Sequence, residues 1–324
     1  MSIPYTYDVS RTFRRWMPEE DPFAQVLRGV ETRFTRIGRP LTGGALTFAW
    51  WNTGVSPSGG DSAVDGGALL SQIVRLCEAS DVVGLGEFSD PMLLMALQEL
   101  LPNNLVARQL DELEGQKVVF KTAMVYNSSR LEFDESLSLM KRNLFRGNGA
   151  DISNQYRIAQ KVRLRIAEID GSIDFYFSHW RMHDQSLDEI ENKDAAARRI
   201  QEDAFGREGE FKKQAAAVLM GDFNAEPQEP HSKELLMSRS GEFVRSYGGF
   251  FNPFWRQFHD ERGTINGGND KLRTKSCLFD YIMVSAPFVK LPNFSCTEWI
   301  GCDLTYNPPP SQHRPVAMRI SWSI

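Results

Sequence analysis

The sequence predicts an α/β fold in which strands and helices alternate from Leu46 to the C-terminus. Short apolar runs with many β-branched and aromatic residues recur along the chain, and such runs are typical of buried strands. Between them lie stretches whose apolar residues repeat at helical spacing. The chain has 324 residues, of which 41% are hydrophobic, so it can bury a core of ordinary globular size.

Polar residues stand at the ends of the predicted strands. These residues are Asn52 after 46–51, Glu87 after 81–86, His179 after 173–178, Asp222 and Asn224 after 215–221, Asp280 before 281–284, and His313 before 314–320. One such placement is common in any protein. Six in one chain are hard to explain by loop composition, and strand ends are where sites form in α/β sheets.

The segment 215–227 (AAAVLMGDFNAEP) is the most informative of these strand ends. Its apolar run predicts a buried strand that ends at Gly221 and then presents Asp222 and Asn224. Residues two apart in an extended chain point to the same side, so the carboxylate and the carboxamide are aligned at the sheet edge. The alternative interpretation is a plain strand end, because Asp and Asn also favour turns.

Three helices are predicted from capping residues and apolar spacing. Asp65 can cap a helix that carries one apolar face, formed by Leu69, Leu70, Ile73, Leu76 and Cys77. Asp90 and Pro91 start a second helix, which Pro102 stops. A third helix runs from 187 to about 205, and its mixed acidic and basic residues are typical of a solvated face.

Residues 1–40 are predicted to form an N-terminal extension, with seven arginines and no clear strand run, ahead of one domain over 41–324. The extension packs along the outside of the domain or contacts a partner, and the sequence leaves both open. No segment reaches the roughly 18 apolar residues that span a bilayer, and the N-terminus lacks the apolar core of a secretory signal. Cys296 and Cys302 could approach each other, but reduced thiols are the simpler interpretation and predict a cytoplasmic protein.

In this order the strand ends resemble the endonuclease/exonuclease/phosphatase superfamily, the metal-dependent phosphoesterases that include type I deoxyribonuclease-like enzymes. The matching pieces are Trp51-Asn52, Glu87, Ser178-His179, 221–224 (GDFN), 279–285 (FDYIMVS) and 311–316 (SQHRPV). The GDFN piece and the late S-x-H-x-P-V are specific in combination. The resemblance implies a four-layer sandwich of two packed mixed β-sheets flanked by helices, with 41–324 as the catalytic domain.

The resemblance also implies a metal site for Mg²⁺, with Mn²⁺ as an alternative. Glu87 is the best direct ligand in the chain, and Asn52 stands where it would coordinate the ion or orient that carboxylate. The family normally has an Asp before the late His, where this chain has Gln312. A Gln oxygen can ligate a hard cation but brings no charge, so the site is one negative charge poorer. The chain is then an enzyme that holds its metal weakly, or a pseudoenzyme that binds phosphate.

The catalytic roles follow from the same resemblance. His313 takes the general-base role, and Asp280 fixes its tautomer and raises its basicity. Asp222 orients or activates the attacking water, and the sequence leaves open which of Asp222 and His313 takes the proton. Asn224 and His179 are expected to hydrogen-bond the non-bridging phosphate oxygens as charge develops on them.

A basic strand supplies a candidate phosphate contact. Lys161, Arg163 and Arg165 alternate with apolar residues, which predicts a half-buried strand with one cationic face. That face is either a solvated strand face or a surface that tracks phosphates, with Arg163 and Arg165 as the contacts. The net charge of -5 argues against a broadly cationic nucleic-acid coat but not against a local patch.

The leading functional hypothesis is therefore a Mg²⁺-dependent phosphodiesterase that acts on nucleic acid as a nuclease. The competing enzyme class is a phosphoesterase for phospholipids or inositol phosphates, which would use the same core residues. The non-enzyme alternative is a phosphate-binding interaction module. The sequence does not distinguish DNA from RNA, an endonuclease from an exonuclease, one metal from two, or the oligomeric state.

Overall fold

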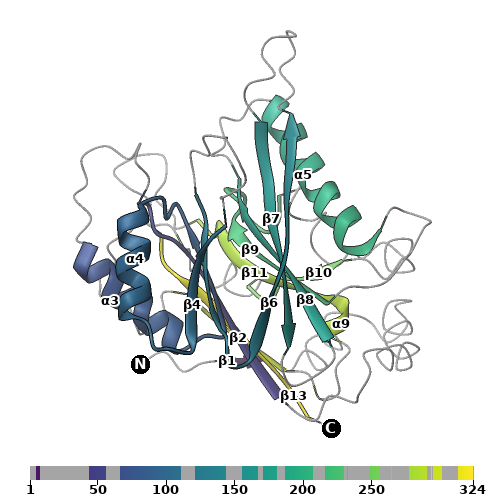
Figure 1. Cartoon of the computed structure of the whole chain (residues 1–324). Coiled ribbons are helices and arrows are strands. Elements are labelled where there is room, and N and C mark those ends of the chain that lie inside the picture. Colours follow the sequence, from purple (N-terminus) through teal and green to yellow (C-terminus); the bar gives the residue numbers. More distant parts are fainter. Residues whose placement is uncertain are drawn as a thin grey trace.

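The computed structural model describes residues 5–7, 44–55, 66–110, 121–143, 155–166, 171–180, 187–206, 216–229, 232, 249–254, 264, 277–289, 293, 295–300 and 313–323. Within these residues the chain folds into two mixed β-sheets packed face to face, with helices on the outside (Figure 1). The predicted four-layer sandwich is confirmed.

The first sheet has seven strands in the order β1-β12-β13-β2-β3-β5-β4. These are β1 (Tyr5–Tyr7), β2 (Gly44–Asn52), β3 (Val82–Gly86), β4 (Leu105–Gln109), β5 (Ala123–Asn127), β12 (Ser295–Ile300) and β13 (Val316–Trp322). Only the central pair, β2 and β3, is parallel, and the other pairs are antiparallel. Because β2 and β3 run side by side, their carboxyl ends meet at one edge of the sheet.

The second sheet has six strands in the order β10-β11-β9-β8-β7-β6. These are β6 (Leu131–Asn143), β7 (Gln155–Ile166), β8 (Gly171–His179), β9 (Ala216–Asp222), β10 (Phe250–Phe251) and β11 (Asp280–Ser285). Its single parallel pair is β8 and β9, and again two carboxyl ends meet at the sheet edge. Each sheet therefore has one parallel pair. The first pair brings the strand ends at Asn52 and Glu87 together, and the second brings those at His179 and Asp222 together.

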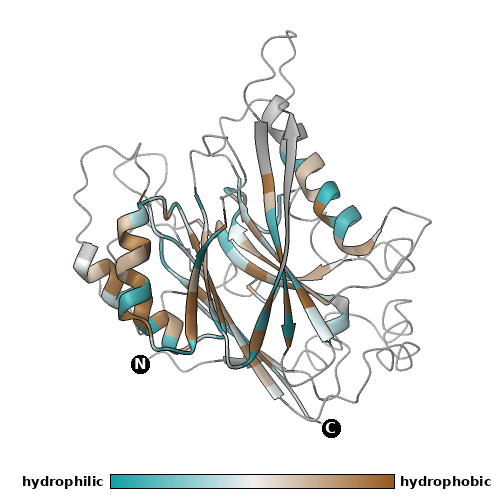
Figure 2. Ribbon diagram, in the orientation of Figure 1, coloured by the Kyte–Doolittle hydropathy of each residue, from teal (hydrophilic) through white to brown (hydrophobic). Residues whose placement is uncertain are grey.

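Helices cover both outer faces of the sandwich (Figure 1). The helices α3 (Gly66–Glu78) and α4 (Pro91–Leu100) bury their apolar faces on the seven-stranded sheet. The helix α5 (Leu187–Phe205) lies along the six-stranded sheet, and a short helix α9 (Ala286–Val289) follows β11. Figure 2 shows brown apolar residues on the strands and on α3 and α4, with teal hydrophilic residues along α5. All three predicted helices are confirmed, and Asp90 caps α4 by accepting the Met92 N–H at 2.8 Å.

The apolar residues form two clusters, one between the sheets and one beneath α3 and α4. Strand β2 contributes to both, since successive side chains of a strand point to opposite faces. Trp50 lies between the sheets and Trp51 lies on the α3–α4 side, and both are fully buried. Two adjacent tryptophans thus anchor the strand whose end carries Asn52.

The N-terminal segment differs from expectation at one point. Tyr5–Tyr7 forms β1, which pairs antiparallel with β12 at the edge of the seven-stranded sheet, in the register Tyr5↔Glu298. A strand of three residues pairs through its backbone and leaves almost no periodic signal in the sequence, so the pattern did not reveal it. Tyr5–Tyr7 is therefore part of the seven-stranded sheet, and the rest of residues 1–40 lies outside the described ranges.

Two further expectations concern cysteines and membranes. Cys77 and Cys296 are buried free thiols, and Cys302 falls outside the described ranges. Burial raises the pKa of both thiols above its ordinary value, and such thiols are unreactive. Among the helices of the described ranges, none is long and apolar enough to cross a bilayer.

Candidate active site

The six-stranded sheet brings three predicted site residues together through its register. His179 ends β8 and Asp222 ends the parallel strand β9, and the two are direct register partners. Asp280 begins the antiparallel strand β11, directly opposite Asp222. The local fit depends on Gly221, because a Cβ there would collide with the backbone carbonyl of Ser178. Only glycine lets β8 and β9 approach closely enough to place His179 beside Asp222.

The seven-stranded sheet supplies the other side of the site. Asn52 ends β2, and Glu87 follows the last residue of β3, while His313 lies three residues before β13. Glu87 has a φ of 52°, in the left-handed region that side chains rarely adopt. This turn of the chain takes the Glu87 carboxylate out of the strand direction and toward Asn52.

Asn52 joins the two sheets. Its Nδ2 donates to Asp222 Oδ2 at 3.0 Å and to Glu87 Oε1 at 3.3 Å, and it lies 3.5 Å from His313 Nε2. The Gly54 N–H donates to Asn52 Oδ1 at 3.2 Å, which orients the amide with its nitrogen toward the carboxylates. One buried carboxamide therefore contacts three of the predicted site residues at once.

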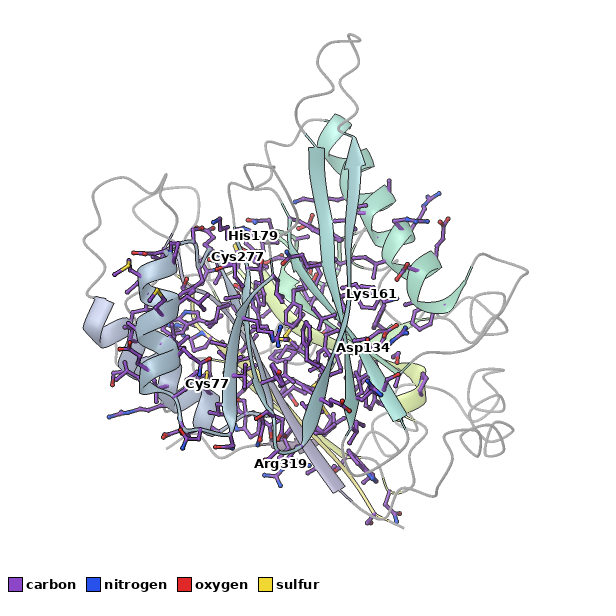
Figure 3. The ribbon with its side chains drawn as sticks, viewed as in Figure 1. Cys77, Asp134, Lys161, His179, Cys277 and Arg319 are labelled. Atoms are coloured by element: carbon purple, nitrogen blue, oxygen red, sulfur yellow. The ribbon has the colours of Figure 1, made fainter. Side chains whose placement is uncertain are left out.

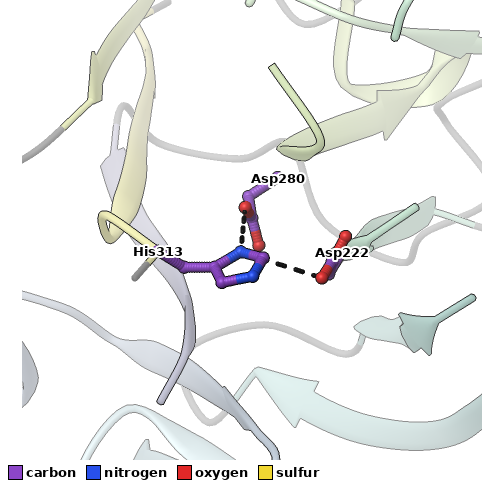
Figure 4. Close-up of side chains that lie close together, drawn as sticks. All are labelled: Asp222, Asp280 and His313. Carbon is purple, nitrogen blue, oxygen red and sulfur yellow. Dashed lines mark hydrogen bonds and ion pairs between the residues drawn. The ribbon is translucent and has the colours of Figure 1, made fainter. Parts of the chain in front are cut away.

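His313 is held by the buried Asp280 (Figure 4). Its Nδ1 lies 2.8 Å from Asp280 Oδ2 and 3.7 Å from Asp222 Oδ2. The other Asp280 oxygen accepts the indole N–H of Trp50 at 3.0 Å, and the carboxylate is fully buried. The indole N–H of Trp51 donates to the His313 carbonyl at 3.0 Å. With Nδ1 turned to Asp280, the Nε2 of His313 is the ring nitrogen that faces Asn52.

His179 lies between two carboxylates. Its Nε2 is 3.5 Å from Glu87 Oε1 and 3.7 Å from Asp222 Oδ2. Figure 3 shows His179 near the upper edge of the sandwich, at the end of its strand. His179 and Asn52 therefore both bridge Glu87 and Asp222, which come from different sheets.

Asn224 follows β9 in a tight turn with a φ of 44°, a conformation that Asn tolerates better than most residues. Its backbone N–H donates to Asp222 Oδ1 at 2.9 Å, and its Nδ2 donates one hydrogen to the Trp180 carbonyl at 2.7 Å. The Nδ2 group carries a second hydrogen for another acceptor. Asn224 thus fixes the Asp222 carboxylate and keeps a donor of its own.

Lys193, which no sequence pattern marks as a site residue, supports this turn from behind. Lys193 lies on α5, is fully buried, and its ammonium donates to the Asn224 carbonyl at 2.7 Å. A buried lysine is rare unless its charge is matched by strong acceptors. The helix pattern predicted a solvated charged face and gave no signal for this position.

Thr264 is a second supporting residue that no sequence pattern marks. Its hydroxyl oxygen accepts the N–H groups of Phe279 and Asp280, each at 3.1 Å, and its carbonyl accepts the Arg314 N–H at 2.7 Å. Thr264 therefore contacts the start of β11 through its side chain and the segment that carries His313 through its backbone carbonyl. A lone Thr in a stretch of polar sequence has no feature that marks such a role.

The pKa values of three site groups are all raised, by burial for the two carboxyls and by neighbouring negative charge for the imidazole. Burial, with the nearby Asp280 charge, raises the pKa of Asp222 above its ordinary value. Burial also raises the pKa of Glu87, although its bond from Asn52 opposes the shift. Burial lowers the pKa of His313, but the charges of Asp280 and Asp222 and the bond to Asp280 outweigh it and raise the pKa to about 9. The site concentrates negative charge, which favours bound protons or a bound cation.

The spacing of these groups is compatible with a metal ion. Asp222, Asp280 and His313 offer ligand atoms that all lie within 4.8 Å of one another. Glu87 stands on the other side of Asn52 with its side chain 19% exposed, more open than either aspartate. Gln312, the third predicted ligand, falls outside the described ranges.

Arg163 and Arg165 do not reach this cluster. Both lie on β7, where Arg163 pairs with the buried Asp174 through two bonds of 2.6 and 2.9 Å, and Arg165 lies 3.7 Å from Glu132. Arg165 stands opposite Ser172, seven residues along β8 from His179, which is roughly 23 Å at about 3.3 Å per residue. The predicted basic strand face exists, but only an extended ligand could touch both it and the cluster.

The fold and the site together define a class of protein. The chain belongs to the endonuclease/exonuclease/phosphatase family, whose model matches residues 49–313, and it is a phosphoesterase by that membership. The match spans every predicted site residue described above, from Asn52 to His313.

Solved structures agree with this family at the level of the fold. A family protein from Bacteroides thetaiotaomicron is 18% identical with a TM-score of 0.61, and the match covers 87% of this chain and 97% of that one. The mannosyl-6-phosphatase Bt3783 of the same organism is 17% identical with a TM-score of 0.56, covering 85% and 99%. D. rerio TDP2 with a single-strand DNA product is 16% identical with a TM-score of 0.51, covering 85% and 98%. No curated protein matches the chain by sequence.

Proposed function

We propose that the protein is a Mg²⁺-dependent phosphodiesterase that hydrolyses nucleic acid. The observation that carries this proposal is the Asp280–His313 pair at 2.8 Å, which lies beside Asp222 and Asn52 at the joint edge of the two sheets. A buried carboxylate that orients an imidazole is the arrangement that general-base catalysis requires.

Glu87 fits the part of the metal ligand. It is a hard oxygen donor, its side chain is the most open carboxylate of the cluster, and among the described residues its Oε2 has no hydrogen bond or ion pair. Asn52 presents its amide nitrogen to Glu87, which supports the orienting role over the ligating one. Gln312 would add a neutral oxygen. Asp280 is assigned to His313 and not to the metal, because both its oxygens already accept hydrogen bonds.

A bound Mg²⁺ would polarise the phosphoryl oxygens and offset the charge of the leaving alkoxide. The protein would supply the remaining steps. In its neutral form, His313 would take the proton of the attacking water at Nε2 as the water oxygen bonds to phosphorus and the ester P–O bond breaks, while Asp280 stabilises the imidazolium that results. Asp222 would hold that water, and it remains the alternative proton acceptor. His179 and the second Nδ2 hydrogen of Asn224 would donate to the non-bridging oxygens.

Nucleic acid is the substrate class that we favour. The D. rerio structure holds a single-strand DNA product, and Arg165 on β7 offers an exposed cation, with its side chain 57% exposed, to a polymer longer than one phosphate. A phosphorylated small molecule or lipid head group is the second candidate, and the mannosyl-6-phosphatase neighbour supports it. The buried free thiols Cys77 and Cys296 fit the proposed cytoplasmic location.

A substrate panel tests the proposal. Single- and double-stranded DNA, RNA, inositol phosphates and sphingomyelin would be incubated with Mg²⁺ or Mn²⁺, with Asp222→Ala as the inactive control. We expect cleavage of a nucleic acid that chelation abolishes and that Asp222→Ala lowers at least about 10²-fold. Cleavage of inositol phosphates alone would select the second candidate. No cleavage of any substrate, together with tight phosphate binding, would indicate a binding module.

Gln312 refines this test. Restoring the usual carboxylate in Gln312→Asp adds one negative charge, so the Mg²⁺ concentration for half-maximal activity should fall. If the wild type is inactive and Gln312→Asp is active, the missing carboxylate explains the inactivity. Calorimetric titration of Mg²⁺ against both proteins shows whether position 312 contacts the ion at all.

A further inference from the structure

Trp50 makes a polar contact that its place in the core does not require. Its indole is fully buried between the two sheets, and Nε1–H donates to Asp280 Oδ1 at 3.0 Å. The other oxygen of the same carboxylate lies 2.8 Å from His313 Nδ1. Asp280 is thus held between an indole from the seven-stranded sheet and the imidazole that we assign as the base.

Strand β3 fixes the position of this indole. Trp50 is the register partner of Gly84 on the neighbouring parallel strand β3. A Cβ at Gly84 would lie 2.7 Å from the Trp50 ring, and a Cβ at Gly86 would lie 2.7 Å from it. Real side chains do not approach so closely, so the two glycines leave the space that the indole fills. The VVGLG sequence of β3 is therefore matched to the size of Trp50.

We propose that Trp50 is a positioning residue that holds the Asp280 carboxylate in the one rotation that serves His313. A carboxylate on a strand can rotate about its terminal bond, and a single bond to His313 would leave that rotation loosely set. A second donor from a rigid, close-packed ring removes the freedom. The hydrogen bond from Trp50 to Asp280 does not depend on the proposed function, whereas its effect on the rate does.

Trp322 offers a matched comparison in the same sheet. Trp322 lies on β13 at the far end of β2, opposite Gly44, and a Cβ at Gly44 would lie 2.8 Å from its ring. Both tryptophans therefore pack over glycine, but Trp322 Nε1 has no hydrogen-bond partner within the described structure. Replacing each by Phe removes the same atoms, and only the change at Trp50 removes a donor to Asp280.

The rate experiment compares Trp50→Phe with Trp322→Phe. We expect kcat of Trp50→Phe to fall about tenfold at nearly unchanged KM, the usual scale for one hydrogen bond to a charged group. Trp322→Phe should keep the wild-type kcat. In an Asp280→Ala background, Trp50→Phe should lower kcat no further. A kcat of Trp50→Phe within twofold of wild type, or an undiminished effect without Asp280, would overturn the proposal.

A second pair of measurements does not depend on turnover or on the folding of Trp50→Phe. The Trp50 indole N–H signal in an NMR spectrum should shift and exchange faster in Asp280→Ala, while the Trp322 signal stays in place. Gly86→Ala should displace the indole and shift the same signal. An unmoved Trp50 signal in both variants would refute the link. If the wild type cleaves nothing while these signals move as expected, the proposed function fails and the positioning contact stands.

Discussion

Asp222 and Asp280 stand directly opposite each other on the antiparallel strands β9 and β11, yet their carboxylates have different partners. Asp280 accepts from Trp50 and lies against His313, with no exposed surface. Asp222 accepts from Asn52 and from the Asn224 backbone, and it lies 3.7 Å from His313 Nδ1. Two carboxylates in one register thus have two environments, a pattern that separates an orienting group from one that handles a proton.

The metal-free protein should lose stability as pH rises through the range where His313 titrates. The folded pKa of about 9 exceeds the ordinary 6.5, so the folded state binds this proton more tightly than the unfolded state. The resulting stabilisation is complete below pH 6.5 and is lost by about pH 9. Thermal unfolding in chelator should show a falling Tm across this window, and His313→Gln should flatten it. Parallel curves for the two proteins would contradict the assignment.

Lys193→Met should impair the Asn224 turn. The substitution keeps most of the buried side-chain volume and removes the donor to the Asn224 carbonyl, so we expect about a tenfold lower kcat and a reduced Tm. Steady-state kinetics and thermal melts measure both effects. Arg199→Met on the solvent side of the same helix, where the side chain is 52% exposed, serves as the control. Equal behaviour of the two variants would remove Lys193 from the site.

Thr264→Val should loosen the start of β11 while keeping the shape of the side chain. The buried N–H groups of Phe279 and Asp280 would lose their common acceptor, at a cost of about 1–3 kcal/mol. Urea unfolding measures that cost, and kcat should fall because the backbone at Asp280 loses the acceptor that holds the start of β11. Thr297→Val on the edge-side strand β12 is the control. The proposal for Thr264 would not survive an unchanged urea midpoint.

Substitutions of the two arginines of β7 should have different effects, on stability at Arg163 and on nucleic-acid binding at Arg165. Arg163→Ala removes the bidentate partner of the buried Asp174 and should destabilise the protein by about 1–3 kcal/mol. Arg165→Ala should change stability by less than about 0.5 kcal/mol, since its side chain is mostly exposed. If nucleic acid tracks this strand, Arg165→Glu should weaken binding and reduce its salt dependence. Binding of labelled oligonucleotides at several salt concentrations reports that effect without interference from folding.

The sequence predicted the site best where the signal is local. The apolar runs before Asn52, Glu87, His179 and Asp222 mark strands, and the structure confirms that each residue stands at or just after a strand end. The family resemblance then implied that these strand ends share one site in a sandwich of two sheets. The order of the strands within each sheet and their register came only from the structure.

Other features depend on contacts between distant segments. Arg163 pairs with Asp174, its register partner on the neighbouring strand β8. Whether Arg163 could contact phosphate therefore depended on a register that the sequence does not show. Lys193 is buried because the Asn224 turn folds over it, 31 residues later in the chain. Hydrophobicity alone predicts that the Trp50 indole is a core residue. Its role as a hydrogen-bond donor appears only from its contact with Asp280, 230 residues away.

Glu87 and Asn224 both hold left-handed backbone conformations, and this has a consequence for protein engineering. Glycine at either position would remove the backbone strain of a positive φ. Selection for thermal stability alone should therefore favour Glu87→Gly and Asn224→Gly. Those same substitutions would delete the proposed metal ligand and a proposed phosphate donor. Screening a library of this protein for heat resistance alone should therefore enrich inactive variants. The screen needs a catalytic readout to retain activity.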